Sequence, residues 1–592
     1  MSVVLSSTSF VGKVAFSTLL PLLVFLSIKV CTKTIKNNLK NRRLLAKVEK
    51  RLKEREDSIE KVRQYAFTLS TERANYITSL SFLLLREELQ LRKITCSEAL
   101  RAYQQKALRS QESTNCVCLF IQEAIEQAEY FDNLSENSSS KLPYLFGIPI
   151  SVKECIKLNG YDCTSGFAQD LFKPSNETDL LLHATAGAIP FVITNIPQSL
   201  CSFGCSNPIY GKTTHPLDSS RVPGGSSGGE SALIATGGSI LGIGTDIGGS
   251  IRIPATFCGL VGFKPSTYRM PQTRNMGTVP GRTLVLANAG PIARDVDTCI
   301  EFCQAIWDCP ALYSSDDYLA PVGFQKNLLY SKEPLRIGYY VTDNYIKAVP
   351  AYERAVRMCV KILESLGHEC IAFDVPASQK FFPLVAANIS ADGGVFLNNK
   401  LDEDLYDPDC DFGFVARKLS PFLKQVLSYL VPFPKLSELL RSVPRTAGDM
   451  RKITEETKVY RRDFLEKMKS ENISVIISPV MSVYPPKHHV APQIMQACNY
   501  TALYNLLDFA AGTVPVTTVT EEDERELQNY RASDPIERLI KQQSENSIGM
   551  PIGVQVAAPP YKEEVALRVL QILFENNNAK PDSVKRFLQQ CN

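Results

Sequence analysis

The chain has 592 residues, 44% of them hydrophobic and 21% charged, which is ordinary for a globular protein with a large buried core. Its net charge of +3 does not indicate a nucleic-acid-binding protein. The 17 cysteines lack the regular spacing of a disulfide framework, so we expect free thiols in a cytosol-facing domain. In that compartment the six N-x-S/T sequons would be chance matches.

Residues 14–28 form an uncharged, mostly apolar stretch close to the N-terminus. With the apolar residues on either side, the stretch approaches the ~20 residues that a membrane-spanning helix needs. A cleaved signal peptide is less favoured, because the residues after Ile28 offer no small-residue cleavage site. A buried core helix would rarely begin so early and carry such a basic tail. We therefore predict an N-terminal membrane anchor over residues 1–31, formed by a transmembrane helix.

A basic segment follows the predicted anchor. Residues 29–55 contain eleven Lys and Arg but only two acids, whereas Lys13 alone precedes the apolar stretch. The positive-inside rule then places the rest of this single-pass protein in the cytoplasm. We expect a basic helical linker region over residues 32–94, which could lie against anionic lipid or be solvated on all sides.

Further along the chain, apolar strand-like runs alternate with helical runs. Strands are expected near residues 148–152, 189–194, 335–340, 370–375 and 475–478, and a helix over 351–366 that ends at Gly367. This alternation predicts an α/β fold with a mostly parallel sheet. Since no clear linker divides residues 95–575, we predict one catalytic domain over residues 95–592.

The segment over residues 223–254, PGGSSGGESALIATGGSILGIGTDIGGSIRIP, is unusually rich in glycine and serine. A flexible linker would not interleave so many apolar residues, and the Walker pattern GxxxxGK[ST] is absent. Residues 224–228 fit the GxSxG nucleophile elbow, but a poor strand precedes them. The five histidines occupy positions typical of structural or solvated residues, so a Ser-His-Asp triad is disfavoured without being excluded.

A serine nucleophile without a histidine needs another base. Lysine can serve when burial lowers its pKa, because the neutral amine then accepts a proton. Lys153 ends the expected strand in GIPISVKE, where it can be desolvated. A lone lysine is more often a solvated surface residue, so this position is by itself a weak candidate.

Three ordered segments resemble the amidase-signature family: GIPISVKE, PGGSSGGESALIATGG and GTDIGGSIRIPATFCGLVGFKPS. GPIARDV at residues 290–296 and GMPIGVQV at residues 549–556 are also similar to that family. The resemblance covers about residues 95–575. It implies the amidase-signature α/β fold, a large twisted mixed β-sheet surrounded by many α-helices, and it implies no metal or organic cofactor.

The resemblance also implies a Ser-Ser-Lys triad. In that triad Lys153 is the general base and later the acid, Ser226 is the bridging residue on a cis peptide, and Ser250 is the nucleophile. The same resemblance assigns the oxyanion hole to the backbone amides of Ile247, Gly248, Gly249 and Ser250, loop support to Asp246 and Arg252, and the acyl pocket to Leu200.

A second membrane signal lies at about residues 412–443. Apolar residues recur there at helical spacing, namely Leu419, Phe422, Leu423, Val426, Leu427 and Leu430, and two prolines separate them from a second amphipathic run. Spacing alone favours a helix pair packed on the core. The neighbouring basic residues fit interfacial helices, and the resemblance implies a membrane cap at this place, so we predict amphipathic membrane-cap helices.

These features together predict a membrane-bound serine hydrolase. The family resemblance implies that it cleaves fatty acid amides, such as acyl ethanolamides and primary fatty amides, to a free fatty acid and an amine through an acyl-enzyme, and that it also cleaves esters. The family resemblance also implies a homodimer, and we expect the protein on an endomembrane, with the endoplasmic reticulum favoured. The alternatives are an amidase of small polar amides, a glutaminase-like amidotransferase subunit and an inactive membrane scaffold. The anchor argues against the first two, and the intact triad positions argue against the third.

Overall fold

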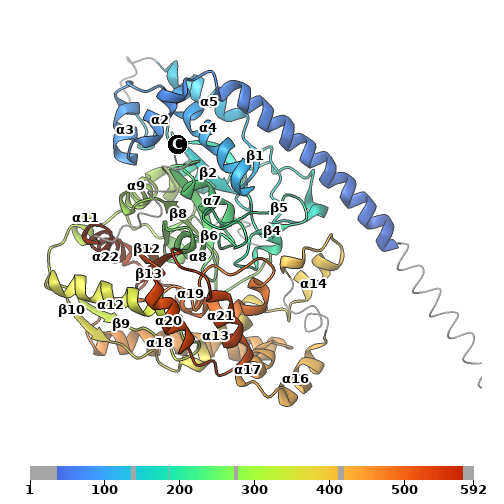
Figure 1. Cartoon of the computed structure of the whole chain (residues 1–592), viewed down its shortest axis with the longest axis vertical. Coiled ribbons are helices and arrows are strands. Elements are labelled where there is room, and N and C mark those ends of the chain that lie inside the picture. Colours follow the sequence, from blue (N-terminus) through green and yellow to red (C-terminus); the bar gives the residue numbers. More distant parts are fainter. Residues whose placement is uncertain (1–35, 135–141, 186, 272–277, 411–418, 578–592) are drawn as a thin grey trace, which may run out of the picture.

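The computed structural model describes residues 36–134, 142–185, 187–271, 278–410 and 419–577 (Figure 1). Within these ranges no helix has both the length and the apolar character required to cross a bilayer. The predicted anchor at residues 14–28 lies outside the described residues.

An 11-stranded sheet forms the centre of the protein, in the order β1-β3-β2-β6-β8-β7-β12-β13-β11-β9-β10. Its strands are β1 (Val117–Phe120), β2 (Pro149–Lys153), β3 (Ile189–Thr194), β6 (Leu241–Asp246), β7 (Val261–Lys264), β8 (Asn288–Ala293), β9 (Arg336–Tyr339), β10 (Glu369–Ala372), β11 (Val475–Pro479), β12 (Ala510–Thr518) and β13 (Pro551–Ala558). The short strands β4 (Ser206–Asn207) and β5 (Gly211–Lys212) pair separately. The expected runs at residues 148–152, 189–194, 335–340 and 475–478 are thus confirmed as strands, and the run at 370–375 as a strand that ends three residues early.

The sheet is mixed, as the family resemblance implied. β2 runs parallel to β3 and β6, and β9 runs parallel to β10 and β11. Between these two parallel groups, β8, β7, β12 and β13 pair antiparallel. The prediction of a mostly parallel sheet is therefore wrong. Alternating apolar runs predict where strands lie along the chain. They do not predict the direction in which each strand runs relative to its neighbours, because that depends on the connections between strands.

Helices surround the central sheet (Figure 1). Those packed against strands include α7 (Gly228–Ala235), α8 (Arg252–Phe257), α9 (Val296–Trp307), α12 (Pro350–Ser365) and α22 (Glu563–Asn576). The helix expected over residues 351–366 is confirmed as α12, and Gly367 follows it with the left-handed φ of 87° that suits a glycine at a helix C-terminus.

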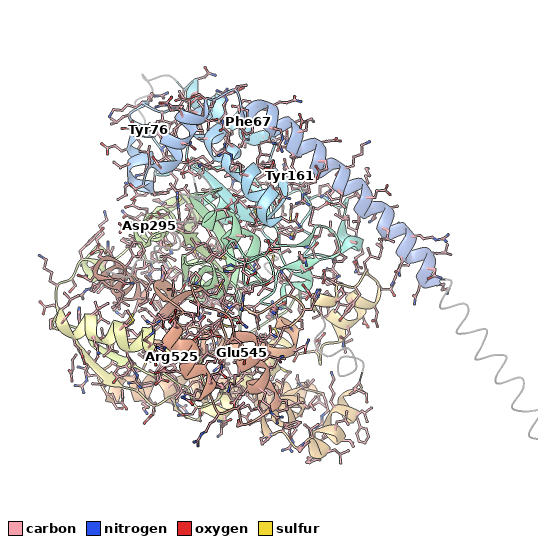
Figure 2. All side chains as sticks on the ribbon, viewed as in Figure 1. Phe67, Tyr76, Tyr161, Asp295, Arg525 and Glu545 are labelled. Carbon is pink, nitrogen blue, oxygen red and sulfur yellow. The ribbon has the colours of Figure 1, made fainter. Side chains whose placement is uncertain are left out.

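A long helix over residues 36–66 runs along the outside of the protein, with side chains projecting both toward the body and into solvent (Figures 1 and 2). Several of its basic side chains contact the body. Lys47 donates to the carbonyl oxygen of Leu171 at 3.0 Å, and Arg51 pairs with Asp162 at 2.9 Å. Near its end, Val62 is buried in the main core. The helix is therefore docked rather than solvated on all sides.

The predicted cap forms a helix pair, α16 (Pro421–Leu430) and α17 (Pro434–Ser442). In α16 the apolar side chains face outward, and Phe422 and Leu430 are 70% and 72% exposed. The face turned inward carries Lys424 and Ser428, which are buried. Spacing alone favoured packing of this apolar stripe on the core. In α16 the stripe instead faces away from the core.

Candidate active site

Lys153 is the last residue of β2, a strand held between β3 and β6, and its side chain is completely buried. Its Nζ donates to Ser226 Oγ at 2.7 Å, to Thr245 Oγ1 at 2.8 Å and to the Thr245 carbonyl oxygen at 3.3 Å. Burial lowers the pKa of Lys153 below its usual 10.5, although nearby acidic groups partly offset this effect. The site therefore favours the neutral amine more than water does.

Ser226 lies in the loop before α7, and the Gly225–Ser226 peptide bond is cis, as the resemblance implied. The backbone here approaches a neighbouring loop closely. A Cβ on Gly225 would lie 2.1 Å from the Gly204 carbonyl oxygen, so no side chain fits at that position. The Ser226 hydroxyl in this closely packed segment accepts the hydrogen bond from Lys153.

Ser250 lies in the loop between β6 and α8, and its carbonyl oxygen accepts a hydrogen bond from Ser227 N at 3.1 Å. Ser226 and Ser250 line the same small pocket, together with the predicted Leu200. Among the described side chains, no hydrogen bond joins the two hydroxyls. The structure thus bonds Lys153 to Ser226 directly and places Ser250 beside them in one pocket.

Asp246 and Arg252 form a fully buried ion pair beneath the Ser250 loop, with contacts of 3.0 Å from Nε and 3.0 Å from Nη2. Burial would raise the pKa of Asp246, but the charge of Arg252 and several hydrogen bonds hold it well below its usual range. Asp246 also accepts from Gly249 N at 2.7 Å and from Ile251 N at 3.2 Å. The pair therefore fixes the loop from inside.

The loop leaves several backbone amides without a hydrogen-bond partner among the described residues. The amides of Ile247, Gly248 and Ser250 have no hydrogen-bond partner among the described residues, whereas Gly249 N is already bonded to Asp246. Thr501 Oγ1 donates to the Gly248 carbonyl oxygen at 2.8 Å, which fixes the orientation of that peptide. Three of the four amides predicted for an oxyanion hole are thus unpaired among the described residues, and two of these three, those of Ile247 and Ser250, belong to residues that line the pocket.

Several residues of the site escaped the sequence interpretation. Thr245 and Gln555 lie inside quoted family segments and hold Lys153 and Arg252, so those segments contained the signal. Thr501 and Asn505 come from α19 (Asn499–Leu506), about 250 residues later in the chain, and no local pattern points to them. The pocket is also lined by Ser199, Cys201, Thr278, Arg282 and Ala287.

None of the five histidines, all within the described ranges, lines this pocket. His215 is buried, contacts the Phe257 carbonyl oxygen through Nε2 at 2.8 Å, and has a pKa lowered to about 4 mainly by burial. His368 accepts a hydrogen bond from Leu335 N at 3.0 Å, and His489 pairs with Asp409. These contacts give these three histidines structural roles, and no histidine lies at Ser226 or Ser250 to act as the base of a Ser-His-Asp triad.

A mixed sheet with a buried lysine and two serines at its pocket is the architecture expected of an amidase, and comparison with known proteins agrees. The chain matches the Amidase family over residues 98–567 and therefore belongs to that family of amide-hydrolysing enzymes. It is 42% identical over 525 residues to Fatty acid amide hydrolase 1 of Caenorhabditis elegans, covering 87% of this chain and 91% of that protein.

Two further relatives support the same family. Fatty-acid amide hydrolase 1 of Sus scrofa is 37% identical over 480 residues, covering 79% of this chain and 81% of that protein. A solved structure of a fatty acid amide hydrolase matches with a TM-score of 0.77 at 24% identity, covering 90% of this chain and 95% of that chain. At that identity the structural likeness shows the fold alone.

Proposed function

We propose that this amidase hydrolyses fatty acid amides through an acyl-enzyme on Ser250. The observation that carries the proposal is the buried Lys153 amine, bonded at 2.7 Å to Ser226 in the pocket that also holds Ser250. A neutral amine at this place can accept a proton, which is what a serine nucleophile needs from its base.

In the proposed reaction, Lys153 takes the Ser226 proton while Ser226 takes the proton of Ser250. The Ser250 oxygen attacks the amide carbonyl carbon, and the charge that develops on the carbonyl oxygen is stabilised by the unpaired loop amides, each contributing about 3 kcal/mol. The proton on Lys153 then returns through Ser226 to the leaving nitrogen. This acid step matters because amines are poor leaving groups, so the C–N bond breaks only when the nitrogen is protonated. Water, activated by the same relay, releases the fatty acid.

The substrate class rests on relatives and on the pocket. The two relatives that share 42% and 37% identity with this chain carry the name fatty acid amide hydrolase. Leu200 and Ile247 give the pocket apolar walls beside Ser250, which suits an alkyl chain. We therefore favour acyl ethanolamides and primary fatty amides as substrates, with the corresponding esters also cleaved.

A membrane location is proposed from two features. The outward apolar face of α16 exposes Phe422 and Leu430, which bury apolar area only when another apolar phase covers them. Residues 14–28 would supply a second attachment, and the positive-inside rule would leave the catalytic domain in the cytoplasm. We extend the proposal to a homodimer on an endomembrane, with the endoplasmic reticulum favoured. The boundaries 1–31, 32–94 and 95–592 remain the proposed division of the chain.

The test is turnover by the purified full-length protein in detergent or vesicles. We expect hydrolysis of oleoyl ethanolamide and oleamide, no detectable hydrolysis by Ser250→Ala, and much slower hydrolysis of acetamide. If acetamide and glutamine were better substrates than the lipid amides, the proposed substrate class would be wrong. If Ser250→Ala kept full activity, the proposed mechanism would be wrong.

A further inference from the structure

Glu230 lies in the first turn of α7, and its side chain is completely buried. Its Oε2 accepts a hydrogen bond from Ser151 Oγ at 2.5 Å, and its Oε1 accepts one from Thr194 Oγ1 at 2.7 Å. The backbone of β6 approaches the same carboxylate so closely that a Cβ on Gly242 would lie 2.0 Å from Oε2. The carboxylate is therefore fixed against β2, β3 and β6, and the proposed reaction leaves it without a role.

The strand register places this carboxylate on the face of the sheet that carries Lys153. Ser151 precedes Lys153 by two residues on β2, so the two side chains point to the same face. Lys153 pairs with Thr194 in the parallel β2–β3 register, which makes these two side chains neighbours on that face. Both hydroxyls that bind Glu230 thus flank Lys153 on the sheet, and Lys153 and Glu230 interact electrostatically.

The other ionisable groups that interact with Lys153 include Cys155, Cys205 and Asp246. Burial raises the pKa of both thiols, that of Cys205 to about 12, so both are neutral at physiological pH. The charge of Asp246 is already balanced by its buried ion pair. Glu230 differs from these groups, because no Lys or Arg in the described part of the chain forms an ion pair with it.

The charge state of Glu230 depends on its burial and on its three neighbours. Burial raises the pKa of Glu230 to about 7, while hydrogen bonds from Ser151 and Thr194 and the charge of Lys153 oppose the rise. The nearby Cys116 thiol is neutral, since burial raises its pKa to about 12. Above about pH 7 the carboxylate is therefore mostly charged, beside an amine whose own pKa burial lowers.

We propose that Glu230 is a positioning residue for the proposed reaction, whose carboxylate keeps Lys153 basic enough to take the serine proton. The inference rests on the proposed function, in which Lys153 is the base. A buried amine that loses its proton too easily is a weak base, and a base works best when its proton affinity matches the operating pH. An anion beside the amine raises that affinity without touching Ser226, Ser250 or the substrate.

The test follows the rate of Ser250 labelling by a fluorophosphonate probe as a function of pH, with the purified full-length protein. This readout reports activation of the serine and requires no choice of amide substrate. For Glu230→Gln we expect the midpoint of the rising limb to move to lower pH by about one unit. We expect the plateau rate to fall about 3- to 10-fold, because the base is weaker.

The matched control is Asp343→Asn, which changes a buried carboxyl that follows β9, toward the opposite edge of the sheet. Asp343 accepts from Tyr345 N at 2.9 Å and from Asn499 Nδ2 at 2.7 Å and, like Glu230, forms no ion pair among the described residues. This variant should leave the midpoint unchanged, because the carboxyl does not face Lys153.

Thr194 provides a second variant at the same contact. Thr194→Val removes a hydroxyl that stabilises the charged carboxylate, so we expect a smaller shift of the midpoint in the same direction. Thr194→Ser keeps the hydroxyl and should leave the midpoint in place. Added to Glu230→Gln, Thr194→Val should shift the midpoint no further, because the charge that the hydroxyl supports is already absent.

A slower rate for Glu230→Gln with an unchanged midpoint would show a purely structural role and overturn the inference, as would a shift to higher pH or an equal shift for Asp343→Asn. If Glu230→Gln does not fold, the two Thr194 variants decide: a lower midpoint for Thr194→Val than for Thr194→Ser supports the inference, and equal midpoints contradict it. The proposed function fails separately, if the unmodified protein is labelled on Ser250 but hydrolyses neither oleoyl ethanolamide nor oleamide.

Discussion

The Lys153 site and helix α16 reverse the usual partition of side chains in opposite ways. At the site, a lysine that proteins normally keep in water is fully buried, and among the described residues its amine donates hydrogen bonds to Ser226 and Thr245. On α16, Phe422 and Leu430 are exposed while Lys424 is turned inward. Each arrangement lowers the stability of the isolated protein, so we expect each to serve a function. The expected functions are proton transfer at the Lys153 site and contact with an apolar phase at α16.

The largest loss of activity is expected when the buried amine of Lys153 is removed. We expect Lys153→Met to lower kcat about 10³- to 10⁴-fold, because general acid and base catalysis are both lost while the apolar isostere fits the buried space. Thermal unfolding should change little, since the variant no longer buries an amine. Steady-state kinetics on oleoyl ethanolamide measures the effect, and retention of more than a tenth of the activity would exclude Lys153 as the base.

The pH profile of the unmodified enzyme tests whether neutral Lys153 is the base. Because burial lowers the pKa of Lys153, the reactive neutral form should be populated below pH 10.5, the usual lysine value. Activity should therefore rise with pH through the lowered pKa and level off above it. A rate that falls over this range, with the protein still folded, would contradict a neutral lysine base.

The Asp246–Arg252 pair shows how the site depends on its buried polar support. Asp246→Ala would leave Arg252 charged and unpaired in the core, and we expect it to lower the free energy of unfolding by about 3 to 5 kcal/mol. Glu353→Ala removes one partner of an exposed pair with Arg357 and is the matched control, with an expected cost below about 1 kcal/mol. Thermal unfolding followed by circular dichroism compares them. Equal shifts in unfolding temperature for the two variants would show that the buried Asp246–Arg252 pair stabilises the protein no more than the exposed pair does.

The cap is tested on a chain that lacks residues 1–31. We expect this chain to keep partial binding to phospholipid vesicles, and the double change Phe422→Ser and Leu430→Ser to weaken that binding about 10- to 100-fold, since each side chain buries apolar area in lipid. Tyr318→Ser with Tyr330→Ser removes two exposed aromatic residues elsewhere and should not matter. Complete solubility of the shortened chain without detergent would refute the membrane role of α16.

The smallest expected effect comes from Thr245. Its Oγ1 accepts a hydrogen bond from Lys153 at 2.8 Å, which favours the charged amine. Thr245→Val should therefore lower the pKa of Lys153 further and move the rising limb of the pH profile toward lower pH by about one unit. We expect the plateau rate to fall less than about 10-fold. A shift toward higher pH would reverse the assigned role of this contact.

Local sequence patterns indicated several residues of the proposed site. GIPISVKE located β2 with Lys153 at its end, and the family segments indicated Ser226 and the loop at Ser250, because in each case neighbouring residues fix the geometry. Long-range packing could not be predicted in this way. Asn505 reaches Asp246 from α19, and Arg282 enters the pocket from a segment without any motif.

The fold shows the same limit. Periodicity located α12 and both cap helices, including the break before Pro434. It could not tell which way the α16 stripe faces, since an apolar face looks the same whether core or lipid covers it. Strand direction was missed for a related reason: the antiparallel pairing of β8, β7 and β12 depends on connections that carry no local signature.

The central claim is that Ser250, and not Ser226, forms the covalent intermediate. The most direct measurement is labelling of the purified protein with a fluorophosphonate probe, followed by mass spectrometry of the modified peptide. We predict one adduct per chain on Ser250, reduced labelling in Lys153→Met, and none in Ser250→Ala. An adduct on Ser226, or labelling of Ser250→Ala at the level of the unmodified protein, would contradict the account.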